Sequence, residues 1–545
     1  MSKPRTLITR AIDAINGVDT RLFIFLLLCL NLLSFVPGDN EETYFALAKQ
    51  YMDPDWIPGS FTFTEWVGTR FLFQHIAGWA LRYLTFEQLA FWGRMVNFLL
   101  YAFPLARIFR LLRIRNTGIL LILQLYIANV NTQSFFGMEW IFGGFEGKTL
   151  AYVFVLWGFY FMLRGDEPSI PGMCQGPDEV QGVRGRAGRN GVQKYVTEPR
   201  ASKTTQPFAG YDTWAAGFAA AASYFHILVG GWFFVLVWIY SLVRERSLKR
   251  AIVTGLVYVA LVAPFVIYLA TYLTDSRTVI HGVDVDWVYS FFRNTHHTAP
   301  MHREGAMQKV LPRVVASFLL LLWCLFGLRR SKDEDVRRLN TIVRITLLMV
   351  FVGLAITYID VHGRLLKYYL FRIAALGTFA AYLLVYVVAR AWLVRRQVDT
   401  VRLLPPVVAM VAIMALIHIE KNFARNIFPR QDRALLELTD YVKAHTRPDD
   451  VFLFRDRDEL SFPRRTRREA LVIFKFDPGG GEKIYEWYTR ECLRRRLRTD
   501  PAVLDTIADR YRLDYLITTS PMTHPRLKEV YRNPKFYLYG VSTSK

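Results

Sequence analysis

The sequence predicts a polytopic α-helical membrane protein that ends in a small α/β domain. Of its 545 residues, 52% are hydrophobic, and the mean hydropathy is +0.19. The apolar residues gather in long uninterrupted runs, which an average soluble domain rarely contains. Residues 420–545 lack such runs and show alternating helix and strand patterns instead. Composition, run length and this change of pattern therefore divide the chain into a membrane part and a C-terminal domain.

The apolar runs predict about eleven transmembrane helices, several of them short, because a bilayer crossing takes roughly 20 residues. The runs lie at 22–37, 89–106, 117–130, 149–163, 213–227, 228–243, 251–273, 310–328, 341–359, 371–394 and 403–419. The fifth and sixth runs could also form one tilted helix. The N-terminus is basic, but no small-residue cleavage motif follows the first run, so we expect an anchor and not a cleaved signal.

Basic clusters follow alternate runs and predict the topology. They contain Arg107, Arg110, Arg113, Arg115, Arg244, Arg246, Lys249, Arg250, Arg329, Arg330, Lys332, Arg337, Arg338, Arg390, Arg395, Arg396 and Arg402. The positive-inside rule places these clusters in the cytoplasm, so the loops 38–70, 131–148, 274–309 and 360–370 and the tail fall outside. We therefore expect a multi-pass protein of the cytoplasmic (inner) membrane with an extracytoplasmic C-terminal domain. The net charge of +22 then reflects topology and contact with anionic membrane lipids, and no nucleic-acid motif is present.

Four regions follow from these patterns. Residues 1–164 form an N-terminal membrane region with a long first outer loop, and residues 212–419 form a second membrane region. Between them, 165–211 is rich in Gly, Pro, Gln and Arg and is expected to be a flexible cytoplasmic linker. Residues 420–545 form the α/β domain. Within it we expect helices at 432–445, 482–498 and 502–511 and strands at 451–454, 471–474, 515–517 and 536–539.

An acidic cluster, Asp39, Glu41 and Glu42, directly follows the first apolar run. Carboxylates are costly at a bilayer unless they are hydrated, paired or functional. Asp39 or Asn40 could cap a helix, and glutamates in the first turn favour the helix dipole. Alternatively, one of the three acids is a general base that deprotonates an acceptor. The two hypotheses are compatible, because a cap also holds a carboxylate in place.

Other outer-side residues could bind a phosphorylated substrate. They are Glu146, Lys148, Arg293, His296, His297, Arg364, Lys367 and Arg372. The first two could instead form a local ion pair, and the last three could contact lipid headgroups. Adjacent histidines cannot face the same way on a helix or strand, which suggests a loop. They could bind phosphate, relay a proton or hold a divalent metal, whereas the four cysteines show no zinc spacing.

The first outer loop resembles that of the GT-C superfamily of integral-membrane glycosyltransferases. That family often carries a D-E-x-x-Y arrangement, and here Glu41 and Tyr44 match its second acid and its tyrosine. Asn40 stands where the first acid usually is, with Asp39 one residue earlier. The resemblance implies that a first-loop acid is the catalytic base and that Tyr44 lies at the substrate, and it leaves open which of the three acids is the base.

Further segments resemble an uncharacterised bacterial family of polytopic GT-C-like proteins. They are Phe145–Lys148, Phe292–His297, Lys475–Pro478 and Glu486–Arg490. The resemblance implies transfer of a sugar from a polyprenyl-phosphate carrier to a lipid, glycan or protein acceptor on the outer face. A polysaccharide polymerase or ligase is an alternative, although its large late outer loop would correspond here only to 274–309. A non-catalytic transporter or scaffold is another, but the predicted spans are nearly free of acids.

Overall fold

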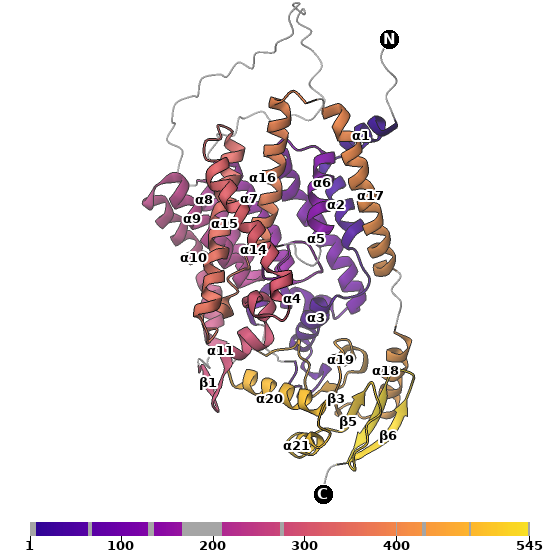
Figure 1. The fold of residues 1–545 in the computed structure, drawn as a ribbon. Coiled ribbons are helices and arrows are strands. Elements are labelled where there is room, and N and C mark those ends of the chain that lie inside the picture. The colour runs from indigo at the N-terminus through magenta and orange to yellow at the C-terminus, as the bar shows by residue number, and fades with distance from the viewer. Residues whose placement is uncertain are drawn as a thin grey trace, which may run out of the picture.

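The computed structural model describes residues 7–63, 68–128, 134, 136–165, 210–272, 277–398, 400–427, 432–478 and 481–542. Apart from its end residues, the predicted linker 165–211 lies outside these ranges. A bundle of long helices occupies most of the molecule, and a small α/β domain lies at one end of it (Figure 1).

Each of the eleven apolar runs contains a helix. These are α2 (Thr20–Leu32), α5 (Phe86–Leu111), α6 (Asn116–Ala128), α7 (Gly147–Arg164), α8 (Tyr211–Phe225), α9 (Ile227–Glu245), α10 (Leu248–Tyr272), α14 (Leu311–Leu322, extended by the π-helical turn η5, Trp323–Gly327), α15 (Glu334–Ile359), α16 (Ala374–Arg395) and α17 (Thr400–Ile427). The run at 213–243 is two helices and not one, because the chain becomes extended at His226 between α8 and α9.

Six of the described helices are long and apolar enough to cross a membrane. They are Phe86–Leu111, Ile227–Arg244, Leu248–Thr271, Ala306–Gly327, Glu334–Ile359 and Ala374–Arg395. A seventh span results if the end of α1 (Leu7–Gly17) and α2, which meet at a bend of 104°, are counted together. The expected count of eleven is therefore not confirmed. Helices such as α6, with 13 residues, reach only about 20 Å at roughly 1.5 Å per residue, less than a bilayer core of about 30 Å.

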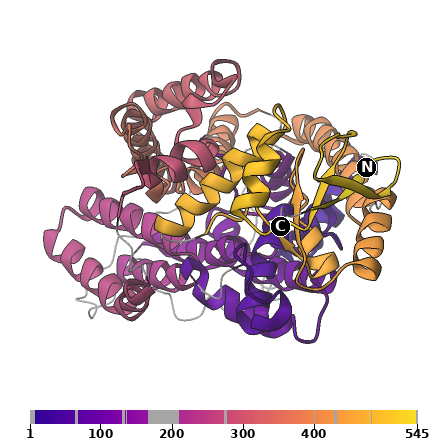
Figure 2. The ribbon, with the colours of Figure 1, turned by 90° about the horizontal axis from the view of Figure 1, so that it is seen from below.

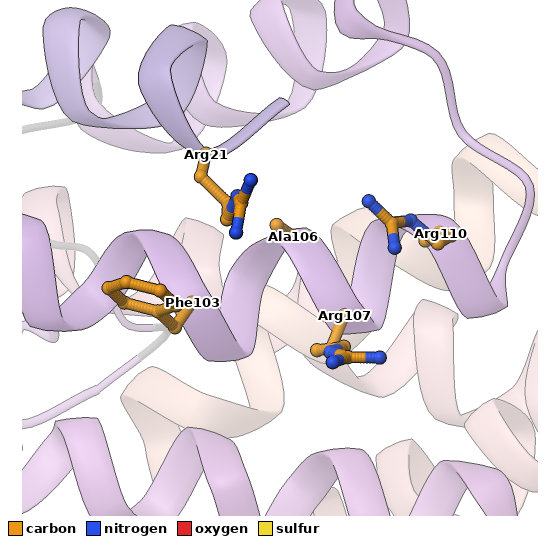
Figure 3. A pocket seen from close by; sticks show the side chains of 5 residues that line it. All are labelled: Arg21, Phe103, Ala106, Arg107 and Arg110. Atoms are coloured by element: carbon orange, nitrogen blue, oxygen red, sulfur yellow. The ribbon is translucent and has the colours of Figure 1, made fainter. Parts of the chain in front are cut away.

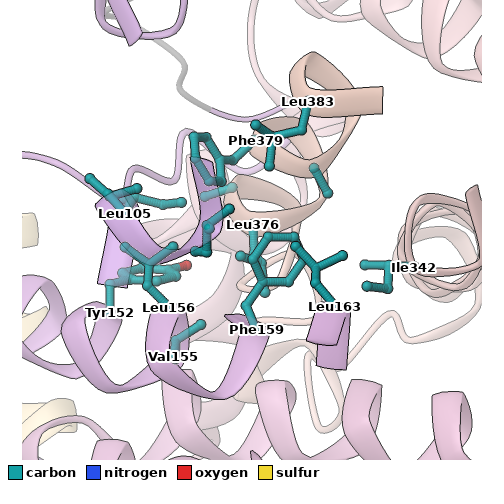
Figure 4. Close-up of a cluster of buried hydrophobic side chains, with 14 of the residues drawn as sticks. Leu105, Tyr152, Val155, Leu156, Phe159, Leu163, Ile342, Leu376, Phe379 and Leu383 are labelled. Carbon is teal, nitrogen blue, oxygen red and sulfur yellow. The ribbon is translucent and has the colours of Figure 1, made fainter. Parts of the chain in front are cut away.

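Apolar side chains both fill the bundle and cover its outside. Side chains of α5, α7, α15 and α16 meet in a large buried cluster that includes Leu105, Phe159, Ile342 and Phe379 (Figure 4). Other large apolar side chains are exposed at helical spacing, as at Leu22, Leu26 and Leu30 of α2. A continuous exposed apolar stripe is expected of a helix face that contacts lipid.

A layer of short elements joins the helices at the end near the C-terminal domain. Between α2 and α5 lie α3 (Asp39–Met52), η1 (Pro54–Trp56), η2 (Gly68–Arg70) and α4 (Phe71–Ala80). Between α10 and α14 lie β1 (Val279–Ile280), β2 (Val283–Asp284), α11 (Val285–Trp287), η3 (Val288–Arg293), α12 (Thr295–Thr298), η4 (Pro300–His302) and α13 (Ala306–Lys309), and η6 (Leu366–Tyr368) precedes α16. His296 and His297 thus lie in a one-turn helix, where the sequence had suggested a loop.

The C-terminal domain is a five-stranded sheet with helices. Its elements are α18 (Arg433–His445), β3 (Val451–Phe454), α19 (Phe462–Thr466), β4 (Glu469–Ala470), α20 (Gly481–Leu497), α21 (Val503–Arg510), β5 (Tyr515–Thr518), β6 (Leu527–Arg532) and β7 (Tyr537–Val541). The strand order is β4-β3-β5-β7-β6, with β3 parallel to β4 and β5 and the remaining pairs antiparallel. Seen from below, the domain lies across the ends of the helices (Figure 2).

The predicted helices of the tail and three of its four predicted strands are present, but the strand expected at 471–474 is wrong. The chain leaves the sheet after β4 and turns, and Leu471, Val472 and Ile473 are buried by packing against other parts of the molecule. An apolar run of four residues does not distinguish a strand from a buried turn. The edge strand β6 was not predicted, because most of its side chains are exposed and its sequence lacks an apolar alternation.

The domain is joined to the layer of short elements and to α5 by charged and apolar contacts. Arg464 of α19 donates to both oxygens of Glu42, at 2.7 and 2.9 Å, and to Glu87 at the start of α5, at 2.6 Å. Glu469 accepts from the backbone of Phe61 and Thr62, each at 3.1 Å. These bonds hold the domain on the same end of the molecule as the acidic cluster.

Candidate functional site

The three acids of α3 have different surroundings. Glu41 is 1% exposed, forms an ion pair with Arg94 of α5, and accepts from the backbone of Phe145 at 2.5 Å and of Gly38 at 2.7 Å. Gly38 is therefore the N-cap residue, and Glu41 closes the capping box from the third helical position, where the sequence had suggested Asp39 or Asn40 as the cap. Both oxygens of Glu41 are engaged in holding α3 against α5.

Glu42 is also engaged, through Arg464, and burial raises its pKa although Arg464 opposes that shift. Asn40 donates to Glu146 at 2.9 Å. Asp39 differs from both, since its side chain is 80% exposed and its nearest described cation is Lys475, 3.8 Å away. Of the acids in the cluster, Asp39 has the carboxylate that an incoming molecule can reach.

Behind α3 lies a buried charge network centred on Glu139. Arg372 donates to Glu139 at 2.6 Å, Lys148 Nζ lies 3.6 Å from the same carboxylate, and His297 Nδ1 lies 3.0 Å from it. Burial opposes ionisation of Glu139, but the charges of Arg372 and Lys148, together with the neighbouring His297, outweigh burial and hold its pKa well below the usual range. A carboxylate held this firmly is a structural anion that fixes the surrounding cations in place.

Tyr44 faces this network from α3. Arg70 donates to the Tyr44 hydroxyl at 2.9 Å, and its guanidinium lies 4.0 Å from the centre of the ring. Burial raises the pKa of the Tyr44 hydroxyl. The positive charges of Arg70 and Arg372 oppose this shift, and the negative charge of Glu146 adds to it. Glu146, the N-cap residue of α7, also accepts from the Trp140 indole at 3.1 Å. Residues from α3, η2, the start of α7 and the turn before α16 thus converge.

A segment of the C-terminal domain contributes further charged residues to the cluster. Arg293 donates to the Lys475 carbonyl at 3.0 Å, and its Nε lies 3.0 Å from Asp477. Through this contact the domain brings the Lys475 ammonium towards Asp39. Burial lowers the pKa of Lys475, and the nearby Asp39 partly offsets that effect.

Cations exceed anions in this cluster, and some of their polar atoms are unsatisfied. Within the described part of the chain, the donors Arg70 Nε and Arg372 Nε are buried without a hydrogen-bond partner, and the acceptor Glu139 Oε1 and the ring nitrogen His226 Nδ1 also lack one. A buried donor without a partner is costly, so such atoms point to a ligand that supplies acceptors. An anion such as a phosphate would do so.

The structure does not bring every sequence candidate to this cluster. Arg364 is exposed, and Lys367 is paired with Asp286 at 2.9 Å. The His296 ring lies beside that of His297, with ring centres 4.0 Å apart and the planes tilted by 43°. In the ranges that the structure describes, no three His, Cys, Asp or Glu side chains are grouped so that they could hold a metal ion.

Sequence reasoning missed four residues of the cluster as site residues: Arg70, Glu139, Lys475 and Asp477. Each belongs to a loop predicted to lie outside or to the tail, and each is a charged residue near apolar neighbours in sequence. Many other charged residues of the predicted outer loops and the tail share this property. Only the contacts between distant segments show that these four residues belong to one cluster.

The half-buried His296 predicts a loss of stability in acid. Burial lowers the pKa of His296 to about 2, helped by the neighbouring His297, Arg293 and Arg303 and opposed by Glu139. Because the unfolded state binds this proton near pH 6.5 and the folded state does not, stability is complete above pH 6.5 and falls as the pH decreases from there. The slope is at most about 1.4 kcal/mol per pH unit for one histidine. Thermal unfolding between pH 7.5 and 5 should show this decrease, and His296→Gln should flatten it, whereas an unchanged slope would contradict the placement.

Comparison with known proteins identifies the fold. No family model and no curated protein matches the sequence. Among solved structures, the chain is similar to ArnT from Cupriavidus metallidurans bound to undecaprenyl phosphate, with a TM-score of 0.50 and 12% identity, covering 97% of this chain and 98% of that one. The apo state of the same protein matches with a TM-score of 0.36, 11% identity and 98% coverage of both chains. At this identity the likeness shows the fold alone: the chain has the fold of ArnT over nearly its whole length, as the fold resemblance expected from the first outer loop implies.

Proposed function

We propose that this protein is a membrane glycosyltransferase that transfers a sugar from a polyprenyl-phosphate carrier to an acceptor. The observation that carries the proposal is the exposed carboxylate of Asp39 next to a buried cluster of cations with unsatisfied polar atoms. An accessible base beside an anion site is what this reaction needs. ArnT, which shares the fold, has been solved with undecaprenyl phosphate bound.

In the proposed reaction, Asp39 accepts the proton of the acceptor hydroxyl as its oxygen attacks the anomeric carbon of the donor. The bond between that carbon and the phosphate oxygen breaks, and the phosphate keeps the electron pair. Arg70, Lys148 and Arg372 stabilise the phosphate as its charge grows. A single displacement of this kind inverts the configuration at the anomeric carbon.

Glu139 and Glu146 act as positioning residues in this proposal. Glu139 holds Arg372 and Lys148 together beside His297, and without it the two cations would repel each other. Glu146 connects the start of α7 to Asn40, the neighbour of Asp39. The two acids therefore fix the position of the cations that bind the phosphate relative to that of the base, Asp39.

Donor binding tests the phosphate site. We expect purified protein to bind undecaprenyl phosphate and not undecaprenol, and Arg70→Gln to weaken binding about tenfold or more, because one charge-assisted hydrogen bond contributes about 1.5–3 kcal/mol. Exposed Arg82, which follows α4, provides the matched control, and Arg82→Gln should bind as the wild type does. Equal binding of the phosphate and the alcohol would contradict the proposal.

We also propose that the C-terminal domain lies on the extracytoplasmic side. The basic clusters on alternate loops support this placement. A phosphatase reporter that is active only outside the cytoplasm, fused after Lys545, should be active, and a reporter active only in the cytoplasm should not. The reverse pattern would move the proposed site to the other membrane face.

A further inference from the structure

A second cation site lies between the start of α2 and the end of α5 (Figure 3). A cavity of about 60 Å³ opens there, lined by Arg21, Phe103, Ala106, Arg107 and Arg110. Organic substrates usually occupy pockets of roughly 300–1,000 Å³. A cavity of this size suits a small anionic group and not a whole sugar donor.

The cavity lies at the opposite end of the bundle from the proposed glycosyltransferase site. Glu87, near the start of α5, is bonded to Arg464 of the C-terminal domain. Arg107 is 20 residues further along the same helix, which corresponds to roughly 30 Å at about 1.5 Å per residue. A bilayer core is also about 30 Å thick, so the arginines lie at the other membrane boundary. In Figure 1, the N-terminal helix α1 lies at that end and the C-terminal domain at the other.

The charges of this cavity are largely uncompensated. Arg21 donates to Asp19 at 3.1 and 3.2 Å. Among the residues that the structure describes, no side chain forms an ion pair or hydrogen bond with Arg107 or Arg110, both of which are exposed. Two guanidinium groups one turn apart repel each other unless an anion lies between them.

The surface next to the arginines is apolar. Phe103 lies one helical turn before Arg107, towards the middle of the membrane, and is exposed. Leu22 and Leu26 of α2 are exposed as well. Guanidinium groups above an aromatic ring and aliphatic side chains match a ligand with a charged head and apolar chains.

We propose that this cavity binds the phosphate headgroup of an anionic phospholipid in the leaflet opposite to the C-terminal domain. Arg107 and Arg110 grip the phosphate oxygens, since the planar guanidinium donates to phosphate in bidentate fashion. The acyl chains lie along Phe103 and the exposed leucines of α2. Basic pockets between membrane helices are suited to such headgroups.

The test uses the full-length protein in nanodiscs or detergent with added phosphatidylglycerol or phosphatidylcholine. Native mass spectrometry counts the retained lipids, and thermal unfolding reports their effect on stability. We expect the wild type to retain phosphatidylglycerol in preference to phosphatidylcholine. The Arg107→Gln/Arg110→Gln double variant should lose that preference, with at least a tenfold lower affinity.

A matched control distinguishes binding at this cavity from a general effect of the positive charge of the protein. Arg329→Gln/Arg330→Gln removes two exposed arginines outside the cavity and should retain the lipid as the wild type does. Equal retention by the Arg107/Arg110 variant and the wild type would overturn the proposal, and so would equal loss in both variants. Displacement of the lipid by millimolar inorganic phosphate would also overturn it, since the site would then bind a free anion.

Discussion

Replacing Asp39 with asparagine should lower sugar transfer about 10²–10⁴-fold while leaving the protein folded. The amide keeps the size and hydrogen-bonding capacity of the side chain but removes the basic oxygen. Because the Asp39 carboxylate is 80% exposed and lies 3.8 Å from Lys475, few contacts that stabilise the fold are lost. The assay measures transfer of a labelled sugar from a polyprenyl-phosphate donor by purified protein, alongside a thermal unfolding curve.

Asp55 provides the matched control for this experiment. It is an exposed acid of the same layer of short elements, in η1, and Asp55→Asn changes the same group without touching the cluster. We expect its transfer rate and its unfolding temperature to match those of the wild type. Full activity of Asp39→Asn would remove the base from the proposal, and an equal loss in both variants would show that acidity in the layer matters in general.

Replacing Glu41 with glutamine should destabilise the protein by about 3–5 kcal/mol, the usual cost of removing one partner of a buried ion pair. The Arg94 guanidinium would remain buried at 6% exposure without its counter-charge. The contacts of Glu41 with the backbone of Phe145 and Gly38 would also weaken. Activity would then fall because the folded population falls, so chemical or thermal unfolding is the measurement that separates this effect from loss of a base.

Two further variants test this explanation. Glu87→Gln alters a partly exposed ion pair of α5 and should cost less than about 1 kcal/mol. The double variant Glu41→Gln/Arg94→Gln should cost less than the sum of its single variants, because it leaves no uncompensated charge. Additive losses would show that the two residues stabilise the fold independently, and wild-type stability of Glu41→Gln would contradict the buried pair.

Asp39 and Glu41 are neighbouring acids with similar sequence surroundings, but their variants are expected to behave differently. They are two residues apart in the same helical turn, yet one variant is expected to remain folded with slow transfer and the other to lose stability. Both substitutions replace a carboxylate with the matching amide and remove one negative charge. The difference lies in what surrounds each carboxylate.

The sequence alone determined the parts of this protein that depend on local pattern. Each apolar run contains a helix, the first-loop acids begin the helix α3, and the tail is an α/β domain with most of the expected elements. Runs of apolar residues and helical or strand periodicity are properties of neighbouring residues, so they can be found without a structure. The same pattern did not determine the number of membrane crossings, because a short helix such as α6 and a full span look alike in hydropathy.

Only the tertiary structure decided which charged residues are free to react. Glu41 meets Arg94, 53 residues away, and Glu42 meets Arg464, 422 residues away, whereas Asp39 keeps an exposed carboxylate. Glu139 meets Arg372, 233 residues away, and also lies 3.6 Å from Lys148, so it holds two cations of the proposed phosphate site. In a poorly hydrated interior, the partner of a charge decides its role, because charge–charge interactions strengthen as water is excluded. That partner is set by packing of distant segments, which local sequence does not specify.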